Sequence, residues 1–194
     1  MNQKNNLTEI ENGIITFIIP SINRESLTQS INSLVNQTNP NWRCIIIYDG
    51  VDGKLFNDHR IETINIDKIG GKSSTHGMSG LVRNEGLKLC KTEWIGFLDD
   101  DDTLHPDYVN MLFSKYSDLD FIIWRMKFSD GLIIPRNDTI SFANVGISIA
   151  YKNKFDNLFF DSNRDGEDFD FVKKLQSLTN NYIITPEIYY NVNH

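Results

Sequence analysis

The stretch IITFIIPSINRESLTQSINSLVNQTNPNWRCIIIYD, residues 14–49, indicates the fold of this chain. It begins with the apolar run 14–20, which is typical of a buried strand. Residues 27–37 then carry apolar side chains at helical spacing, and residues 44–48 form a second apolar run. A strand, a helix and a strand in this order predict a βαβ unit.

The same alternation continues outward from this unit. Residues 61–66 and 94–98 predict further strands, and residues 81–90 and 106–116 predict helices, the latter with Pro106 in its first turn. The remaining elements expected are strands at 121–128, 131–134 and 145–152, a helix at 167–178, and short strands at 182–184 and 188–190. This order predicts an α/β fold with a right-handed, mainly parallel, Rossmann-like sheet, helices on both faces and antiparallel additions towards the C-terminus.

Composition describes one ordinary globular domain. The chain has 194 residues, of which 40% are hydrophobic, and its formal net charge of -7 argues against a nucleic-acid partner. Cys44 and Cys90 are expected to be buried free thiols in a reducing compartment. Residues 1–12 are polar and lack a signal pattern, and no apolar run approaches the length of a membrane span. The expected location is therefore cytoplasmic, with peripheral membrane association left open.

Four consecutive aspartates, Asp99 to Asp102, directly follow the apolar run 94–98. Neighbouring carboxylates repel and raise one another's pKa unless a cation or a ligand offsets them. Carboxylate oxygens suit Mg²⁺ or Mn²⁺, and such ions keep positions open for substrate phosphates. The alternative is a solvated acidic turn in which Asp102 or Thr103 caps the next helix.

Polar residues follow three of the expected parallel strands. They are the segment 20–23, Asp49 with Gly50, and the aspartate run. Because the carboxyl ends of parallel strands meet at one edge of the sheet, these residues are expected to line one crevice. Arg83, at the start of the next helix, could bring a forked cationic donor to the same edge. It could equally be a surface arginine in a plain ion pair.

Motifs along nearly the whole chain resemble those of family 2 glycosyltransferases of the GT-A fold. They are ITFIIPSINR, SLVNQTNPNWRCIIIYDGVDG, GLVRNEGLKLCKTEWIGFLDDDDTLHPDYV and GEDFDFVKKL, in that order. The resemblance implies a single GT-A domain over residues 13–194. Its nucleotide-binding half would span residues 1–105, including the polar segment 1–12, and its acceptor-side half residues 106–194.

The resemblance implies a metal-dependent transferase that uses a nucleotide sugar, most simply a UDP-sugar. Asp49 would accept the ring N–H of a uracil-type base, although it could be only a turn-forming residue before Gly50. Asp101 would ligate Mn²⁺ or Mg²⁺, with His194 completing the metal site unless that terminal side chain is frayed. The residues expected to bind the nucleotide sugar are Pro20, Asp49, Arg83, Asp99, Asp100 and Glu167.

Asp168 matches the aspartate of the family's E-D motif, which implies the base of an inverting displacement. Its place at the start of a helix favours the ionised carboxylate that a base needs. Glu167 and Asp168 could instead only complement the helix dipole. The donor sugar and the acceptor are not readable from the sequence, and an acceptor site built from Trp124, Arg125 or Arg164 is one suggestion.

Two other functions compete with this interpretation. The string Asp99 to Thr103 also fits the D-x-D-x-T loop of haloacid-dehalogenase-type phosphatases, with Asp99 as nucleophile. A nucleotide- or metal-binding module without transferase chemistry is the non-enzymatic alternative. The sequence also departs from the family pattern, because Ile22 stands where an aromatic residue often stacks on the base.

Overall fold

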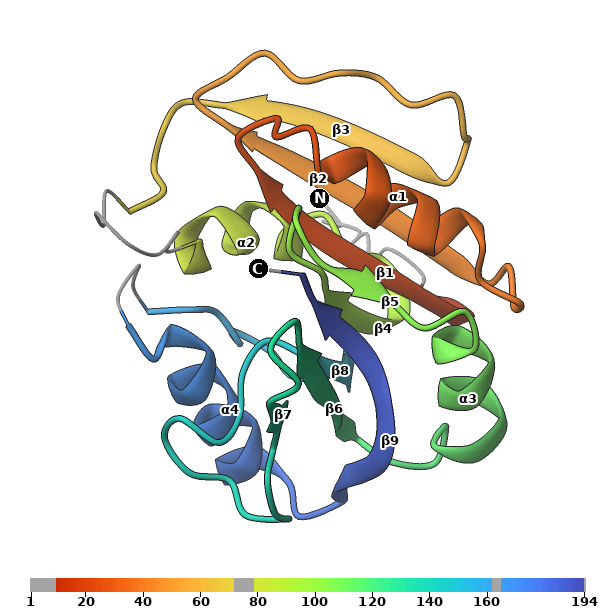
Figure 1. The fold of residues 1–194 in the computed structure, drawn as a ribbon, viewed down its shortest axis with the longest axis vertical. Helices are drawn as coiled ribbons and strands as arrows, with labels where there is room; N and C mark the ends of the chain where they lie inside the picture. The colour runs from red at the N-terminus through yellow and green to blue at the C-terminus, as the bar shows by residue number, and fades with distance from the viewer. Residues whose placement is uncertain (1–9, 72–78, 162–164, 194) are drawn as a thin grey trace, which may run out of the picture.

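The computed structural model describes residues 10–71, 79–161 and 165–193 of the chain. Strands and helices follow one another through its first half as the apolar pattern predicts, with β2 and β3 joined without a helix (Figure 1). The elements in chain order are β1 (Glu11–Ser21), α1 (Leu27–Val35), β2 (Trp42–Asp49), β3 (Ile61–Ile66), α2 (Gly80–Leu87), β4 (Thr92–Phe97), β5 (Thr103–Leu104), α3 (Tyr108–Lys115), β6 (Phe121–Phe128), β7 (Ile133–Ile134), β8 (Ile149–Lys152), α4 (Glu167–Leu178) and β9 (Tyr182–Val192).

The described strands form one curled sheet in the order β3-β2-β1-β4-β8-β6-β9-β5, with β7 paired to β6 (Figure 1). Strands β3, β2, β1 and β4 are parallel to one another. Strand β8 then enters antiparallel between β4 and β6. The predicted α/β class, with a parallel first half and antiparallel additions, is confirmed.

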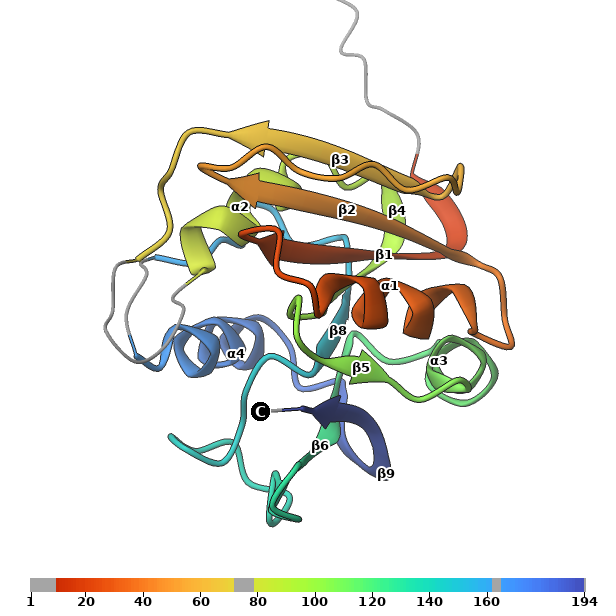
Figure 2. The same cartoon turned by 45° about the horizontal axis from the view of Figure 1, so that its top comes forward.

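Strand β2 shows why helices cover both faces of this sheet. Cys44, Ile46 and Tyr48 pack in the main core with Leu27, Ile31 and Leu34 of α1, while Ile45 and Ile47 pack with Val82 of α2. Because successive side chains of a strand point to opposite faces, an unbroken apolar run can serve both helices. Figure 2 shows α1 and α2 on opposite sides of the strands.

Aromatic side chains fix the other two helices. Tyr108 of α3 packs edge-on against Phe17 of β1, with ring centroids 5.3 Å apart. On the opposite face, Phe171 of α4 packs edge-on against Phe97 of β4 at 5.5 Å and stacks on Phe160 at 4.3 Å. Helix α4 is thereby fixed on the side of the sheet that carries α2.

The C-terminal segment differs from the two short strands predicted at 182–184 and 188–190. It forms one strand, β9, which continues through Pro186 and pairs with β6 on one side and β5 on the other. The register shifts where Ile184 and Ile188 of β9 oppose Ile123 and Arg125 of β6. Such a bulge leaves Pro186, which lacks an N–H, outside the regular ladder.

Several predicted boundaries need correction. The strands expected at 131–134 and 145–152 are shorter, and β5 is an extra strand that forms by pairing with β9. The segment 1–12 overlaps the start of β1 at Glu11. Asp102 and Thr103 do not cap α3, because the N-cap of that helix is Asp107.

Both cysteines are free thiols, as predicted; Cys44 is buried and Cys90 is partly buried. None of the helices in the described part of the chain is both long enough and apolar enough to cross a bilayer.

Candidate functional site

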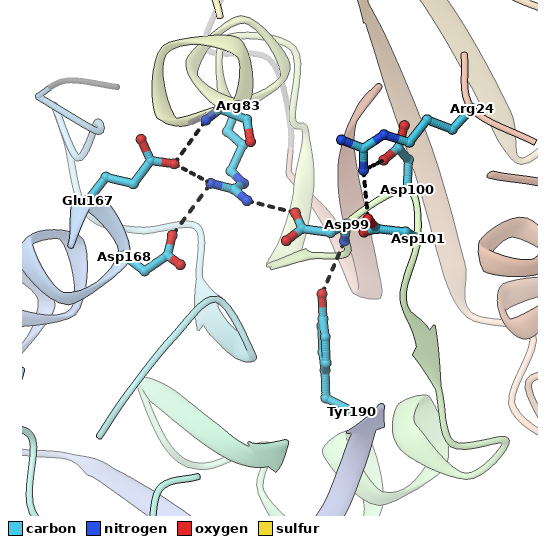
Figure 3. A network of polar contacts seen from close by, with 9 residues as sticks. Arg24, Arg83, Asp99, Asp100, Asp101, Glu167, Asp168 and Tyr190 are labelled. Carbon is cyan, nitrogen blue, oxygen red and sulfur yellow. Dashed lines mark hydrogen bonds and ion pairs between the residues drawn. The ribbon is translucent and has the colours of Figure 1, made fainter. Parts of the chain in front are cut away.

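Three of the predicted strand ends meet at one edge of the sheet, where β1, β2 and β4 finish side by side. The hydroxyl of Ser21, the last residue of β1, donates to Asp100 Oδ2 at 2.6 Å. The aspartate run after β4 is thus tied directly to the end of β1. The polar residues after β1 and β4 that were expected to line one crevice therefore lie together, and the side chains around them are drawn in Figure 3.

Arg83 is the centre of this polar network. Its Nη2 lies 2.7 Å from Asp99 Oδ1, and its Nη1 lies 2.8 Å from Glu167 Oε1 and 3.4 Å from Asp168 Oδ1 (Figure 3). The side chain is only 3% exposed. The alternative of a surface arginine in a plain ion pair is therefore wrong: Arg83 is a buried cation that joins the aspartate run to the first turn of α4.

Glu167 and Asp168 face the aspartate run from the start of α4. Glu167 Oε1 also accepts the backbone N–H of Ser79 at 3.0 Å, whereas its buried Oε2 has no hydrogen-bond partner among the described residues. Burial raises the pKa of Glu167, against the lowering effect of Arg83 and the backbone N–H groups. Glu167 is therefore a buried carboxylate that Arg83 and Ser79 hold in place.

Asp168 is the more exposed of the two, with 29% of its side chain open to solvent. Burial raises its pKa, Arg83 lowers it, and the charges of Asp99 and Glu167 raise it again, to about 7. A carboxylate with a pKa near neutrality can accept a proton at neutral pH and release it afterwards. This is the behaviour that a general base requires.

The four aspartates of the run have different surroundings. Asp100 is buried, and its Oδ1 lies 3.2 Å from Arg24 Nη1, which also lies 2.6 Å from Asp101 Oδ2 (Figure 3). Asp102 is buried as well and accepts the backbone N–H of Asn193 at 3.1 Å. Burial and neighbouring carboxylates raise the pKa of Asp102 to about 8 and that of Asp100 above its ordinary value. The predicted crowding of like charges is real.

Tyr190 supports the run from beneath. Its hydroxyl accepts the backbone N–H of Asp99 at 3.1 Å, and its ring is fully buried (Figure 3). Asn193, just past β9, donates its side-chain amide to the carbonyl of Asp101 at 3.0 Å. The end of β9 therefore fixes the backbone of a loop that β4 alone would leave unsupported.

Asp49 is the last residue of β2, and its side chain is buried like those of the residues before it in the strand. Its carboxylate accepts the backbone N–H groups of Ile69 at 2.6 Å and Gly70 at 3.0 Å, and Lys68 Nζ lies 3.1 Å away. Burial alone would raise its pKa, but these three donors lower it below the ordinary value. A Cβ on Gly70 would lie 2.3 Å from Asp49 Oδ2, so this close approach requires glycine.

Beside Asp49 lies an open groove of about 670 Å³. Its lining comes from the segments after β2 and at the end of β3, namely Gly50, Val51, Asp52, Asn65, Ile66, Asp67 and Lys68. Ile22 is 47% exposed. It stands at the position where many family members have an aromatic residue that stacks on the base. The groove is polar and open, and it adjoins the crevice at the strand ends.

The donor set fits a hard divalent cation only in part. Asp101 offers an oxygen at the mouth of the crevice, with 26% of its side chain exposed, although Arg24 now pairs with it. Among the described residues, no group of three or more His, Cys, Asp or Glu side chains is placed to hold a metal ion. His194 lies outside the described residues.

The two suggested acceptor residues that the structure describes, Trp124 and Arg125, have other roles. Trp124 was a wrong choice, because it is fully buried in the core between Tyr108 and Tyr116. Arg125 pairs with Asp138 at 2.6 Å, and Arg164 lies outside the described residues. Pro20 is buried within β1, so it can support the crevice but presents no polar side chain to it.

The sequence did not single out Arg24 or Tyr190 for this site, and it included Ser21 only as part of the segment 20–23. Ser21 and Arg24 lie in or next to the segment after the first strand that was expected at the crevice, so their position gave a signal. Tyr190 gave none, because only the pairing of β9 with β6 and β5 brings it under the aspartate run.

Comparison with known proteins identifies the family and the fold of the chain. The family model described as "Glycosyl transferase family 2" matches residues 16–164. A poly(ribitol-phosphate) beta-N-acetylglucosaminyltransferase, TarP of Staphylococcus aureus, is 33% identical over 121 residues. A poly(ribitol-phosphate) beta-glucosyltransferase of Bacillus spizizenii is 30% identical over 131 residues. These matches take in 56% and 63% of this chain but only 35% and 20% of the relatives, so the chain spans a minor part of their length.

Among solved structures, S. aureus TarS 1–349 in complex with UDP-GlcNAc has a TM-score of 0.73 and 18% identity. The match covers 93% of this chain and 58% of that one. TarS 1–349 without the sugar nucleotide gives a TM-score of 0.71. At this identity the likeness shows the fold alone, and that fold is the GT-A fold that the motifs implied.

Proposed function

Because the chain belongs to glycosyl transferase family 2, we propose that it transfers a sugar from a UDP-linked donor to a hydroxyl group of an acceptor, with inversion at the anomeric carbon. The observation that carries the proposal is the placement of Asp168. It lies across the crevice from the aspartate run, joined to Asp99 through Arg83. A base on one side and a polar binding surface on the other are what a direct displacement requires.

In this reaction Asp168 takes the proton of the attacking hydroxyl. The acceptor oxygen forms its bond to the anomeric carbon as the bond from that carbon to the diphosphate oxygen breaks, and UDP leaves. Glu167, which Arg83 and Ser79 hold in place, would orient a hydroxyl of one of the sugars. Removal of a proton by a positioned base is worth about 10²–10⁴-fold in rate.

The donor would lie along the strand ends. We assign its nucleobase to the groove beside Asp49, and its ribose and diphosphate to the side of Asp99 and Asp100. The solved relative that carries UDP-GlcNAc supports uridine as the nucleoside, since it shares this fold. Asp49 already accepts two backbone N–H groups, so it supports the base site at least as much as it can contact the base itself.

Metal dependence is part of the proposal. Asp101 and His194 would hold Mn²⁺ or Mg²⁺ together with the donor phosphates, and such an ion supplies charge stabilisation for the leaving diphosphate. For Asp101 to take this role, Arg24 must leave its present contact at 2.6 Å. The aspartate crowding and the exposed Asp101 oxygen support this assignment.

The acceptor is proposed only as a class. Curated relatives are named for poly(ribitol-phosphate) and for other bacterial polymers, including teichuronic and colanic acids. A polymer of the kinds named there, a polyol phosphate or a polysaccharide, is the acceptor class that we propose. Which polymer this chain extends or decorates is a matter for acceptor assays.

A phosphatase is the second candidate, and the site does not favour it. Its nucleophile would be Asp99, whose Oδ1 is held by the buried guanidinium of Arg83 at 2.7 Å. A binding module without catalysis is also less favoured. It would not need a carboxylate at the position of Asp168 with a pKa raised to about 7.

The test is titration calorimetry with UDP, GDP, CDP and ADP, each with Mn²⁺ and with EDTA, followed by measurement of UDP release from UDP-glucose and UDP-GlcNAc. We expect saturable binding of UDP above the other nucleotides, and slow UDP release that an acceptor accelerates. Binding of none of the four nucleotides would refute the proposed function. Phosphate release from simple monoesters would indicate the phosphatase instead.

A further inference from the structure

An aromatic side chain stands exposed at the start of α4. Phe142 lies in the segment between β7 and β8 and is 64% exposed, although most large apolar side chains of this chain are buried. A phenyl ring that stays mostly exposed adds little to the free energy of folding, because that stabilisation comes from apolar area removed from water. Single exposed apolar residues are common on protein surfaces. Phe142 differs from them because the loop that carries it is held in a defined conformation.

The loop that carries Phe142 is held by a buried amide. Asn144, 6% exposed, accepts the backbone N–H of Arg136 at 2.8 Å. Its Nδ2 donates to the carbonyl of Thr139 at 2.7 Å and to Asn137 Oδ1 at 3.1 Å. One side chain therefore cross-links both sides of the turn, and Phe142 is presented from a fixed backbone.

The ring has a seat on the helix. Cε2 of Phe142 lies 2.7 Å from the position that a Cβ would occupy on Gly166, whose φ of +83° also favours glycine. The ring meets Phe169 of α4 edge-on, with centroids 5.8 Å apart and planes at 87°. A side chain at position 166 would push the ring away, so Gly166 both starts the helix and makes room for Phe142.

This seat adjoins the proposed base. Gly166 directly precedes Glu167 and Asp168, and the helix rises by only about 1.5 Å per residue. The ring therefore packs next to the first turn of α4, which carries the proposed base. A group that binds on Phe142 would lie at the same end of α4 as Asp168, whose carboxylate points towards Arg83 (Figure 3).

We propose that Phe142 is a binding platform for the acceptor, on which a neutral sugar ring stacks with its apolar C–H face. The inference rests on the proposed function and adds to it the chemical class of acceptor. An aromatic ring offers a flat apolar surface that matches the face of a pyranose, whereas an open polyol chain has no such face.

The negative charge of the first turn of α4 also favours a neutral acceptor over a phosphorylated one. The first turn of α4 carries Glu167, Asp168 and Asp170, which would repel a phosphate placed on the neighbouring ring. A phosphate-bearing polyol acceptor therefore fits this surface poorly. We expect a pyranose-containing glycan at the position next to the reacting hydroxyl.

The experiment is saturation-transfer NMR on the chain with UDP bound, using methyl β-glucopyranoside, methyl β-galactopyranoside and methyl N-acetyl-β-glucosaminide as probes. Ribitol and ribitol 5-phosphate are the open-chain comparison. The variants are Phe142→Ala, Phe142→Tyr and, as a matched control, Leu178→Ala. Leu178 is a 53% exposed apolar residue at the other end of α4.

We expect at least one pyranoside to bind the wild type, with saturation strongest on its ring C–H protons. Its affinity should fall at least fivefold in Phe142→Ala and stay within twofold in Phe142→Tyr and Leu178→Ala. UDP titrations of the same samples report on the donor side and on folding.

The inference is overturned if no pyranoside binds while UDP does, if Phe142→Ala binds the pyranosides like the wild type, or if ribitol 5-phosphate binds in a Phe142-dependent way. In each of these cases the proposed function survives. Failure of the wild type to bind UDP would instead count against the proposed function itself.

Discussion

Arg83 Nη1 lies 3.4 Å from Asp168 Oδ1 while the same guanidinium holds Asp99 at 2.7 Å through Nη2. A single buried cation thus joins the proposed base to the loop proposed to bind the donor. The pKa of Asp168 is raised although Arg83 lies beside it. The ionisation of the proposed base therefore depends on the balance between burial, which raises this pKa, and the charge of Arg83, which lowers it.

Replacing Asp168 by Asn should lower the rate of sugar transfer by about 10²–10⁴-fold, because the amide cannot take up the acceptor proton. UDP affinity should change little, since the donor surface lies on the opposite side of the crevice. Stopped assays of UDP release and calorimetry measure the two quantities. Asp161→Asn, at an exposed carboxylate paired with Lys174, is the control. Equal activity of both variants would remove Asp168 from the mechanism.

The pH dependence follows from the raised pKa of Asp168. The base must be ionised before it acts, so kcat/KM should rise about tenfold per pH unit below about pH 7 and level off above it. Steady-state rates between pH 5 and 9 at saturating metal would show this limb. A flat profile over the range would contradict the assignment of the base.

Changing Arg83 should move this profile. Arg83→Gln removes the positive charge that lowers the pKa of Asp168, so the rising limb should shift to higher pH, and Arg83→Lys should restore part of the shift. Arg43→Gln, at a half-exposed ion pair with Glu11, is the matched control. A loss of UDP binding with an unmoved profile would indicate that Arg83 contacts the nucleotide instead.

The metal assignment is tested on binding rather than turnover. Asp101→Asn should weaken the binding of Mn²⁺ to the UDP complex at least tenfold, because it removes the exposed carboxylate at the crevice. Asp130→Asn, at an exposed turn, should leave it unchanged. UDP affinity that is the same with Mn²⁺ and with EDTA would show that the donor needs no ion here.

Asp49 should matter for stability as well as for the donor. Its carboxylate accepts two backbone N–H groups and pairs with Lys68, so Asp49→Asn leaves buried donors without their ionised partner. We expect a loss of about 1–3 kcal/mol in the free energy of unfolding. Urea titrations followed by circular dichroism measure it, with the exposed Asp52→Asn as reference; equal stability of the two variants would contradict the role.

Phe97 holds the sheet to α4 beneath the site. Phe97→Ala removes edge-on contacts with Phe160 and Phe171 and should cost about 3–5 kcal/mol. Phe142→Ala, at an exposed ring, should change the free energy of unfolding by less than about 0.5 kcal/mol. If the two variants were equally stable, the aromatic cluster would not be what fixes α4.

The first half of the fold could be predicted because its signals are local. Runs such as 44–48 are apolar on both faces, and the helix between two such strands has one apolar stripe, so the alternation alone dictates a parallel sheet with helices on both sides. The same rule placed Asp49 and the aspartate run at one edge. Residues 61–66, 121–128 and 167–178 even have the predicted limits.

Sequence alone therefore determined the fold class, the family and the motif residues that lie together after the strands, since apolar periodicity and motif order are properties of the chain itself. Only the tertiary structure decided what those residues do to one another. Whether Arg83 is a surface cation or a buried link depends on where α4 docks, and whether Tyr190 supports Asp99 depends on the pairing of β9. Burial and pKa arise from neighbours that lie many residues away, and no local pattern encodes which of them will meet.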